Sequence, residues 1–223
     1  MNSTLNFYNE VIIFLFFVAT VLWIGLTLYS SLISQNYLKI VDGNEKKSYL
    51  LNIQANVMWY MRWSALVSFG LSVYLMSFIS NIDYAYNIGT SLASLLITIM
   101  FLNTWLIIWR KQKRIIAQTR DWQKCESRYD LAIRTNSIFA IPLLGLMLYS
   151  AQAKDVVNPL LDIDGNFGPG WSSYALWVSI VLLLLFEANL VFGKIRNWMD
   201  SPKKIILTGL VLTALIGLLL RYS

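Results

Sequence analysis

The sequence predicts an all-α integral membrane protein, a six-helix transmembrane bundle, from its composition and from the pattern of its apolar segments. The chain has 223 residues, of which 57% are hydrophobic and 13% charged, and its mean hydropathy is +0.56. Soluble domains are about 45–50% apolar and about 25% charged, so this composition excludes an ordinary soluble enzyme and a disordered chain. The apolar runs are continuous rather than alternating, which indicates helices and not a membrane barrel.

Six apolar segments are each about long enough to cross the roughly 30 Å hydrocarbon layer of a bilayer. In chain order they cover residues 11–33, 57–79, 88–109, 133–151, 173–193 and 205–220. The first segment lacks a basic region before it and is longer than the apolar part of a signal peptide, so we expect it to remain in the protein. Together the six segments predict a single membrane domain over residues 1–223.

The positive charges predict how the bundle lies in the membrane. Fourteen of the 18 lysines and arginines fall between the first and second, third and fourth, or fifth and sixth segments. Lysine and arginine collect on the cytoplasmic side, so the net charge of +6 indicates topology rather than nucleic-acid binding, and both termini are expected on the non-cytoplasmic side. Aromatic residues cluster near both expected boundaries, where they suit the membrane interface: Trp59, Trp63, Trp105 and Trp109 on the basic side, and Tyr84, Tyr86, Trp171 and Tyr174 on the other. Contact of the basic side with anionic lipid headgroups is a compatible use of these charges.

Three charged residues fall inside the predicted helices: Arg62, Arg134 and Glu187. Charged groups in a membrane are costly and are candidates for function. The predicted topology places all three in the cytoplasmic third of the membrane, and three asparagines lie at a similar depth: Asn103, Asn136 and Asn189. We expect Glu187 to be neutralised by one or both arginines. The cluster then has two open interpretations, a structural lock between helices or a site for an anion, a quinone headgroup or a proton.

The residue inventory narrows the cofactors. The chain has no histidine and a single cysteine, Cys125, so it offers no metal site of its own and no histidine pair for haem. No flavin or dinucleotide motif is present. The expected cofactor is therefore none bound by this chain alone, with a quinone or the cofactor of a partner subunit as the alternatives.

Several short stretches, in order and spacing, resemble the membrane part of the bacterial urate hydroxylase family, identified as the urate oxidase N-terminal domain. The matching stretches are residues 23–25, 58–63, 103–109, 112–113, 134–136, 141–142, 187–189, 192–193 and 207–211. The resemblance implies a multi-pass protein of the bacterial inner membrane that works with a redox chain, and Arg62, Arg134, Asn136, Glu187 and Asn189 fall on polar positions of the family. Members carry histidines where this chain has Phe16 and Gln152, and full-length members continue into a cytochrome c domain that is not in this sequence.

Three hypotheses follow for the function. The first is a histidine-free membrane subunit of a redox or respiratory assembly, a scaffold with a quinone or anion pocket at the charged cluster, next to other membrane subunits that include a cytochrome. The second, implied by the resemblance, is a membrane urate oxidoreductase, which would need a partner's cofactor because this chain has no histidine. The third is a carrier of small anions that uses the same arginines.

Overall fold

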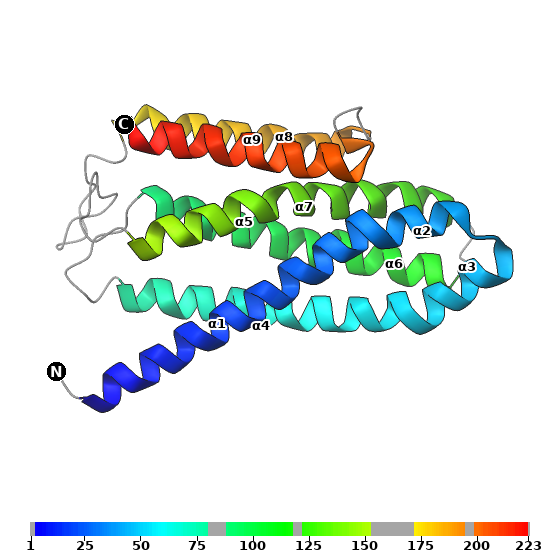
Figure 1. Ribbon diagram of the computed structural model, residues 1–223, viewed down its shortest axis with the longest axis horizontal. Helices are drawn as coiled ribbons and strands as arrows, with labels where there is room; N and C mark the ends of the chain where they lie inside the picture. The colour runs from blue at the N-terminus through cyan, green and yellow to red at the C-terminus, as the bar shows by residue number, and fades with distance from the viewer. Residues whose placement is uncertain (1–2, 80–87, 118–121, 153–171, 195–198, 223) are drawn as a thin grey trace. The chain divides into compact units, whose positions relative to one another are not determined.

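The structure, a computed structural model, describes residues 3–79, 88–117, 122–152, 172–194 and 199–222, and every element in these ranges is a helix (Figure 1). The prediction of an all-α protein is therefore confirmed. Nine α-helices and three short π-helical segments are described, and in chain order they are α1 (Ser3–Tyr29), η1 (Ser30–Ser34), α2 (Gln35–Ile40), α3 (Gly43–Tyr49), η2 (Leu50–Gln54), α4 (Ala55–Ile79), α5 (Ile88–Leu102), η3 (Asn103–Ile108), α6 (Trp109–Ile116), α7 (Trp122–Gln152), α8 (Tyr174–Phe192) and α9 (Pro202–Arg221).

Several helices are longer than their apolar segments, because hydropathy marks only the part of a helix that suits lipid. The first helical run continues through η1 into α2 as far as Ile40, where the expected segment ended at residue 33. The fourth begins at Trp122, eleven residues before the expected start at residue 133, because the polar stretch that precedes the apolar segment is also helical. At about 1.5 Å per residue these runs exceed the thickness of the hydrocarbon layer.

Local chemistry explains where the last two helices begin. The Ser173 hydroxyl accepts a hydrogen bond from the Ala175 N–H at 3.2 Å, which caps α8. Ser201 caps α9 in the same way by accepting from the Lys204 N–H at 3.4 Å, and Pro202 occupies the first helical position. Such caps satisfy N–H groups that have no partner within the helix.

Five helical segments in the described part of the chain are long and apolar enough to cross a membrane. They are Tyr8–Ile40, Ile88–Ile116, Gln123–Tyr149, Tyr174–Phe192 and Pro202–Arg221. Many large apolar side chains on these helices are exposed to the surroundings, as in Phe14, Leu185 and Leu207. Such surfaces suit contact with lipid, and the chain is a multi-pass membrane protein. The predicted second crossing, α4, is not among these five segments of the described chain.

The chain divides into two compact units, and α4, α5 and α7 contribute residues to both. The first unit contains residues 1–72 and 101–136, and the second contains residues 73–100 and 137–223. A single membrane domain over residues 1–223 stays a prediction.

The second unit has an apolar core with one very close helix contact. A Cβ atom added at Gly209 of α9 would lie 3.1 Å from the Ile138 carbonyl oxygen of α7, and one at Gly145 of α7 would lie 2.8 Å from the Thr213 side chain. Small residues allow this close approach of two helix backbones. Helices α8 and α9 lie side by side in the same unit (Figure 1).

Candidate ligand site in the first unit

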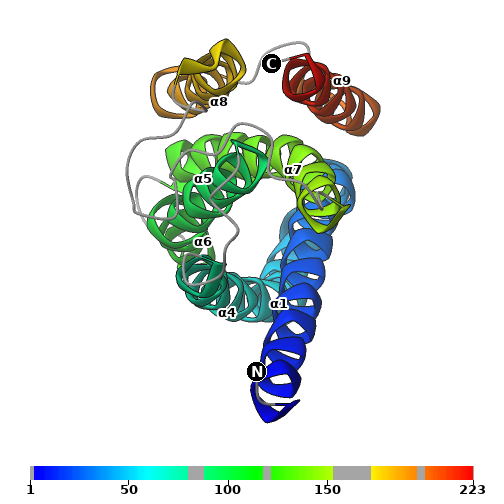
Figure 2. The same ribbon diagram turned by 90° about the vertical axis from the view of Figure 1, so that its left-hand side faces the viewer.

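The interior of the first unit is unusually polar for a membrane protein. Its buried polar or charged side chains are Asn9, Thr20, Thr27, Ser30, Ser31, Ser34, Gln35, Gln54, Ser64, Ser68, Ser72, Asn103, Thr104, Gln112, Arg134, Thr135 and Asn136. Buried polar groups are costly unless they are hydrogen-bonded, and several of these side chains bond to one another within the unit. One such pair links α1 to α4, where the Thr20 hydroxyl donates to the Ser68 hydroxyl at 3.2 Å. Figure 2 shows these two helices next to each other.

All three π-helical segments belong to this unit, and each contributes buried polar residues. The π-helix is rare and occurs mostly as single turns at functional sites. Ser30, Ser31 and Ser34 lie in η1, and Gln54 lies in η2. Segment η3 contributes Asn103 and Thr104. The three turns therefore present polar side chains to the interior at points where the regular helical pattern is interrupted.

Gln54 connects its own helical run to three others. Its side-chain oxygen accepts a hydrogen bond from the Ser34 hydroxyl at 2.7 Å, and its side-chain nitrogen donates to the Tyr129 hydroxyl at 2.7 Å. The Gln112 amide donates to the Gln54 backbone carbonyl at 3.3 Å. Gln54 is almost fully buried, so these bonds have little competition from water. Gln54, Ser34, Tyr129 and Gln112 were not among the predicted site residues.

Asn103 and Asn136, two of the predicted site residues, meet inside the unit. The Asn103 amide nitrogen donates to the Asn136 side-chain oxygen at 3.0 Å, and the Asn136 amide nitrogen donates to the Thr104 hydroxyl at 3.3 Å. All three side chains are buried. The two asparagines join η3 to α7, and a depth in the membrane that they share with the charged residues stays a prediction.

Arg134 is buried on α7, with only 2% of its surface exposed. It interacts electrostatically with Asp130, one helical turn earlier on the same helix. The Asp130 carboxylate also interacts with Lys39, Lys46 and Glu126, and its Oδ1 atom is inaccessible to water and accepts no hydrogen bond in the described part of the chain. Asp130 was not predicted as a site residue because it lies before the apolar segment. Its spacing of four residues from Arg134, which places both side chains on one helix face, could have indicated it.

Arg62 contacts aromatic rings. Its guanidinium carbon lies 4.6 Å from the ring centroid of Trp109, 5.2 Å from that of Trp63 and 5.5 Å from that of Trp105. These are cation–π distances. Within the described ranges no carboxylate forms a salt bridge with Arg62. The Arg62 side chain is therefore held by tryptophans at the edge of the first unit.

Glu187 and Asn189 belong to α8 in the second unit. The Asn189 amide nitrogen lies 3.8 Å from the Met199 sulfur, a weak hydrogen bond that connects α8 to the residues before α9. The predicted pairing of Glu187 with Arg62 or Arg134 joins residues of different units and stays a prediction. The expected interface residues Tyr84, Tyr86 and Trp171 lie outside the described residues.

No protein-family model matches the chain, and no characterised protein or solved structure is significantly similar to it. The resemblance to the urate hydroxylase membrane domain therefore rests on the sequence motifs and stays a prediction.

Proposed function

We propose that this protein is a membrane subunit of a redox assembly that holds a quinone headgroup beside Arg134, inside the first unit. The observation that carries the proposal is the burial of Arg134 in the first unit, whose interior also contains neutral hydrogen-bonding side chains. A guanidinium offers several N–H donors in a fixed plane and suits ligands that present carbonyl or carboxylate oxygens.

The charge balance of the site favours a carbonyl-bearing ligand over an anion. Asp130 interacts electrostatically with Arg134, so part of the positive charge is already offset within the unit. The same unit contains the buried amides of Asn103, Asn136 and Gln54, which are neutral. A quinone headgroup, which is neutral and reaches the site from the lipid, fits this set better than a small anion does.

The same proposal includes the topology and the cellular setting. We infer that α4 is the sixth crossing, that the basic side faces the cytoplasm of a bacterial inner membrane, and that both termini lie on the other side. An α-helix of 25 residues is about 37 Å long, which is enough to cross the hydrocarbon layer. The redox setting and the partner subunits are supported by the sequence resemblance, and electron transfer would use a cofactor of a partner such as a cytochrome.

Native purification followed by mass spectrometry tests the proposal. Membranes are solubilised gently, the tagged chain is isolated, and both its lipids and its partner polypeptides are identified. We expect a quinone in about equal amount to the wild-type chain, a loss of that quinone in Arg134→Gln, and a partner that carries a redox cofactor in both preparations. Arg110→Gln is the matched control, because Arg110 is exposed on α6, and it should retain the quinone. A wild-type chain that purifies without quinone or partner would reject the proposal.

A further inference from the structure

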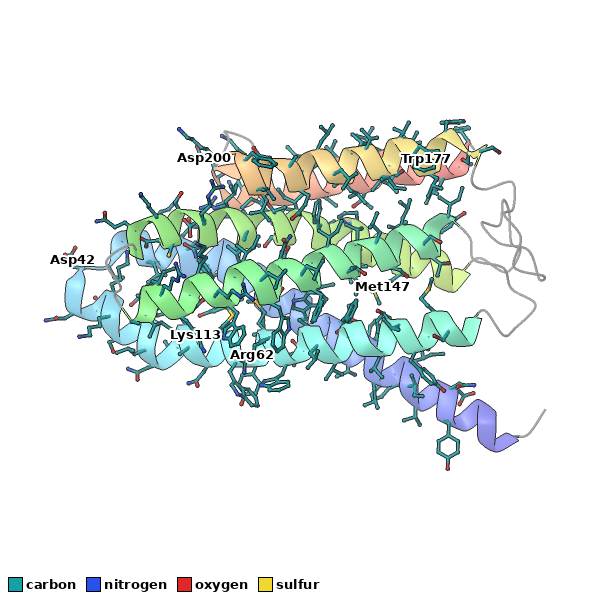
Figure 3. All side chains as sticks on the ribbon, turned by 180° about the vertical axis from the view of Figure 1, so that it is seen from behind. Asp42, Arg62, Lys113, Met147, Trp177 and Asp200 are labelled. Atoms are coloured by element: carbon teal, nitrogen blue, oxygen red, sulfur yellow. The ribbon has the colours of Figure 1, made fainter. Side chains whose placement is uncertain are left out.

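A group of tryptophans and two cations forms a distinct surface of the first unit, which we name the tryptophan–cation surface. It contains Arg62 of α4 and Lys113 of α6 with Trp63, Trp105 and Trp109. Figure 3 shows Arg62 and Lys113 on neighbouring helices. We propose that this surface binds the phosphate headgroup of an anionic phospholipid in the leaflet on the basic side of the protein.

Both cations share one aromatic ring. The Lys113 ammonium lies 4.7 Å from the Trp109 ring centroid, and the Arg62 guanidinium carbon lies 4.6 Å from the same centroid. Neither cation forms a salt bridge with any carboxylate in the part of the chain that the structure describes. Aromatic rings orient the two cations but do not neutralise them. The described residues therefore leave two positive charges here without a carboxylate partner.

The surface also contains hydrogen-bond donors without acceptors. The Arg62 Nε and the Trp105 Nε1 atoms are inaccessible to water and have no hydrogen-bond partner among the described residues. Donors of this kind are costly in an apolar setting, because nothing replaces the hydrogen bonds that water would have made. Phosphate oxygens would supply negative charge to the two cations and acceptors to the other N–H groups of the Arg62 guanidinium and the Lys113 ammonium.

The surroundings of the two cations favour a lipid over a free anion. Trp59 is 53% exposed and Trp63 is 41% exposed, and Leu102 and Leu106, which lie close to Trp105 along the third helical run, are exposed as well. Tryptophan is enriched at the level of lipid headgroups, and the leucines offer an apolar surface for acyl chains. Rings stack further along this surface, where Phe69 and Phe101 lie 4.3 Å apart between centroids. A ligand with a charged head and apolar tails matches both parts.

The experiment measures quenching of tryptophan fluorescence in the full chain by phospholipids with brominated acyl chains. Detergent micelles receive increasing mole fractions of brominated phosphatidylglycerol, which is anionic, or of brominated phosphatidylcholine, which is zwitterionic. For the wild-type chain we expect half-maximal quenching at about tenfold lower mole fraction of phosphatidylglycerol, the preference that one to two cations near a membrane surface provide. Arg62→Gln/Lys113→Gln should remove this preference, so that the two titrations coincide.

The control is Arg110→Gln/Lys111→Gln. It also removes two positive charges, both of them from α6, but leaves the cation–π contacts of Arg62 and Lys113 unchanged. It should retain the preference. An equal loss in both double variants would indicate general surface charge and would overturn the proposal, as would an unchanged preference in Arg62→Gln/Lys113→Gln. Lys113→Gln alone changes an exposed side chain and should reduce the preference even if the double variant does not fold.

A third arm separates a lipid from a free phosphate. Glycerol 3-phosphate carries the charged head without acyl chains, and we expect it not to displace brominated phosphatidylglycerol from the wild-type chain. Displacement at micromolar concentration would identify the surface as a site for a soluble phosphate and would overturn the assignment to a lipid.

Discussion

Replacement of Gln54 by leucine tests whether the polar interior of the first unit is a connected network. Leucine has nearly the volume of glutamine but no hydrogen-bonding group. The substitution removes the bonds to the Ser34 and Tyr129 hydroxyls, both 2.7 Å long and both buried. A buried polar group that loses its partner costs about 1–3 kcal/mol, so the two together predict a loss of about 2–6 kcal/mol in the free energy of unfolding. The measurement is reversible unfolding of the purified protein in mixed micelles with increasing SDS, followed by circular dichroism.

Two further variants make this result specific. Asn56→Leu is the matched control: Asn56 is exposed two residues later and donates to the Asn52 carbonyl, so its replacement should change stability by less than about 0.5 kcal/mol. In a Tyr129→Phe background the Gln54→Leu substitution should cost at least 0.5 kcal/mol less, because the lost partner is already absent, an amount at the low end of about 0.5–3 kcal/mol for residues in one network. Equal costs of Gln54→Leu in both backgrounds, or a cost no larger than that of Asn56→Leu, would refute the network.

Two other predictions concern helix packing and topology. Gly209→Ala places a methyl group 3.1 Å from the Ile138 carbonyl oxygen and should reduce the free energy of unfolding by about 1–3 kcal/mol. The control Gly217→Ala, on the same helix, meets nothing within 4 Å and should be neutral or stabilising. Equal effects of the two substitutions in the same unfolding assay would show that α9 does not approach α7 this closely. The topology is tested in a background whose native cysteine is replaced by serine, with a maleimide that does not cross the membrane. Lys47→Cys should react only after the membrane is permeabilised, whereas Tyr222→Cys should react in intact spheroplasts. The reverse pattern would reject the topology.

The sequence predicted the membrane class and the approximate places of the helices, because apolar content and hydropathy depend on composition over long windows. It predicted less well where helices begin and end. The stretch before residue 133 is polar and still helical, since helix formation does not require lipid. Hydropathy reports the environment of a segment and not the limits of its hydrogen-bonding pattern.

The candidate site was predicted in part for a similar reason. Asn103 and Asn136 are polar residues inside apolar runs, and this made them visible in the sequence; the structure brings them together. Gln54 and Asp130 lie just beyond such runs, where polar residues are ordinary, and only the long helices and π-turns bring them into a buried layer. The contacts of Arg62 with three tryptophans depend on side-chain direction, which spacing along one helix does not determine.

The most direct test of the central claim is binding of a quinone to the purified chain. Decylubiquinone is titrated into the wild-type protein and into Arg134→Gln, Arg134→Lys and Arg62→Gln, and the midpoint of thermal unfolding is followed. A ligand that binds only the folded state raises this midpoint. We expect a saturable rise in the unfolding midpoint for the wild type and for Arg62→Gln, a smaller rise for Arg134→Lys and none for Arg134→Gln. No rise in the wild type, or an equal rise in Arg134→Gln, would contradict the central claim.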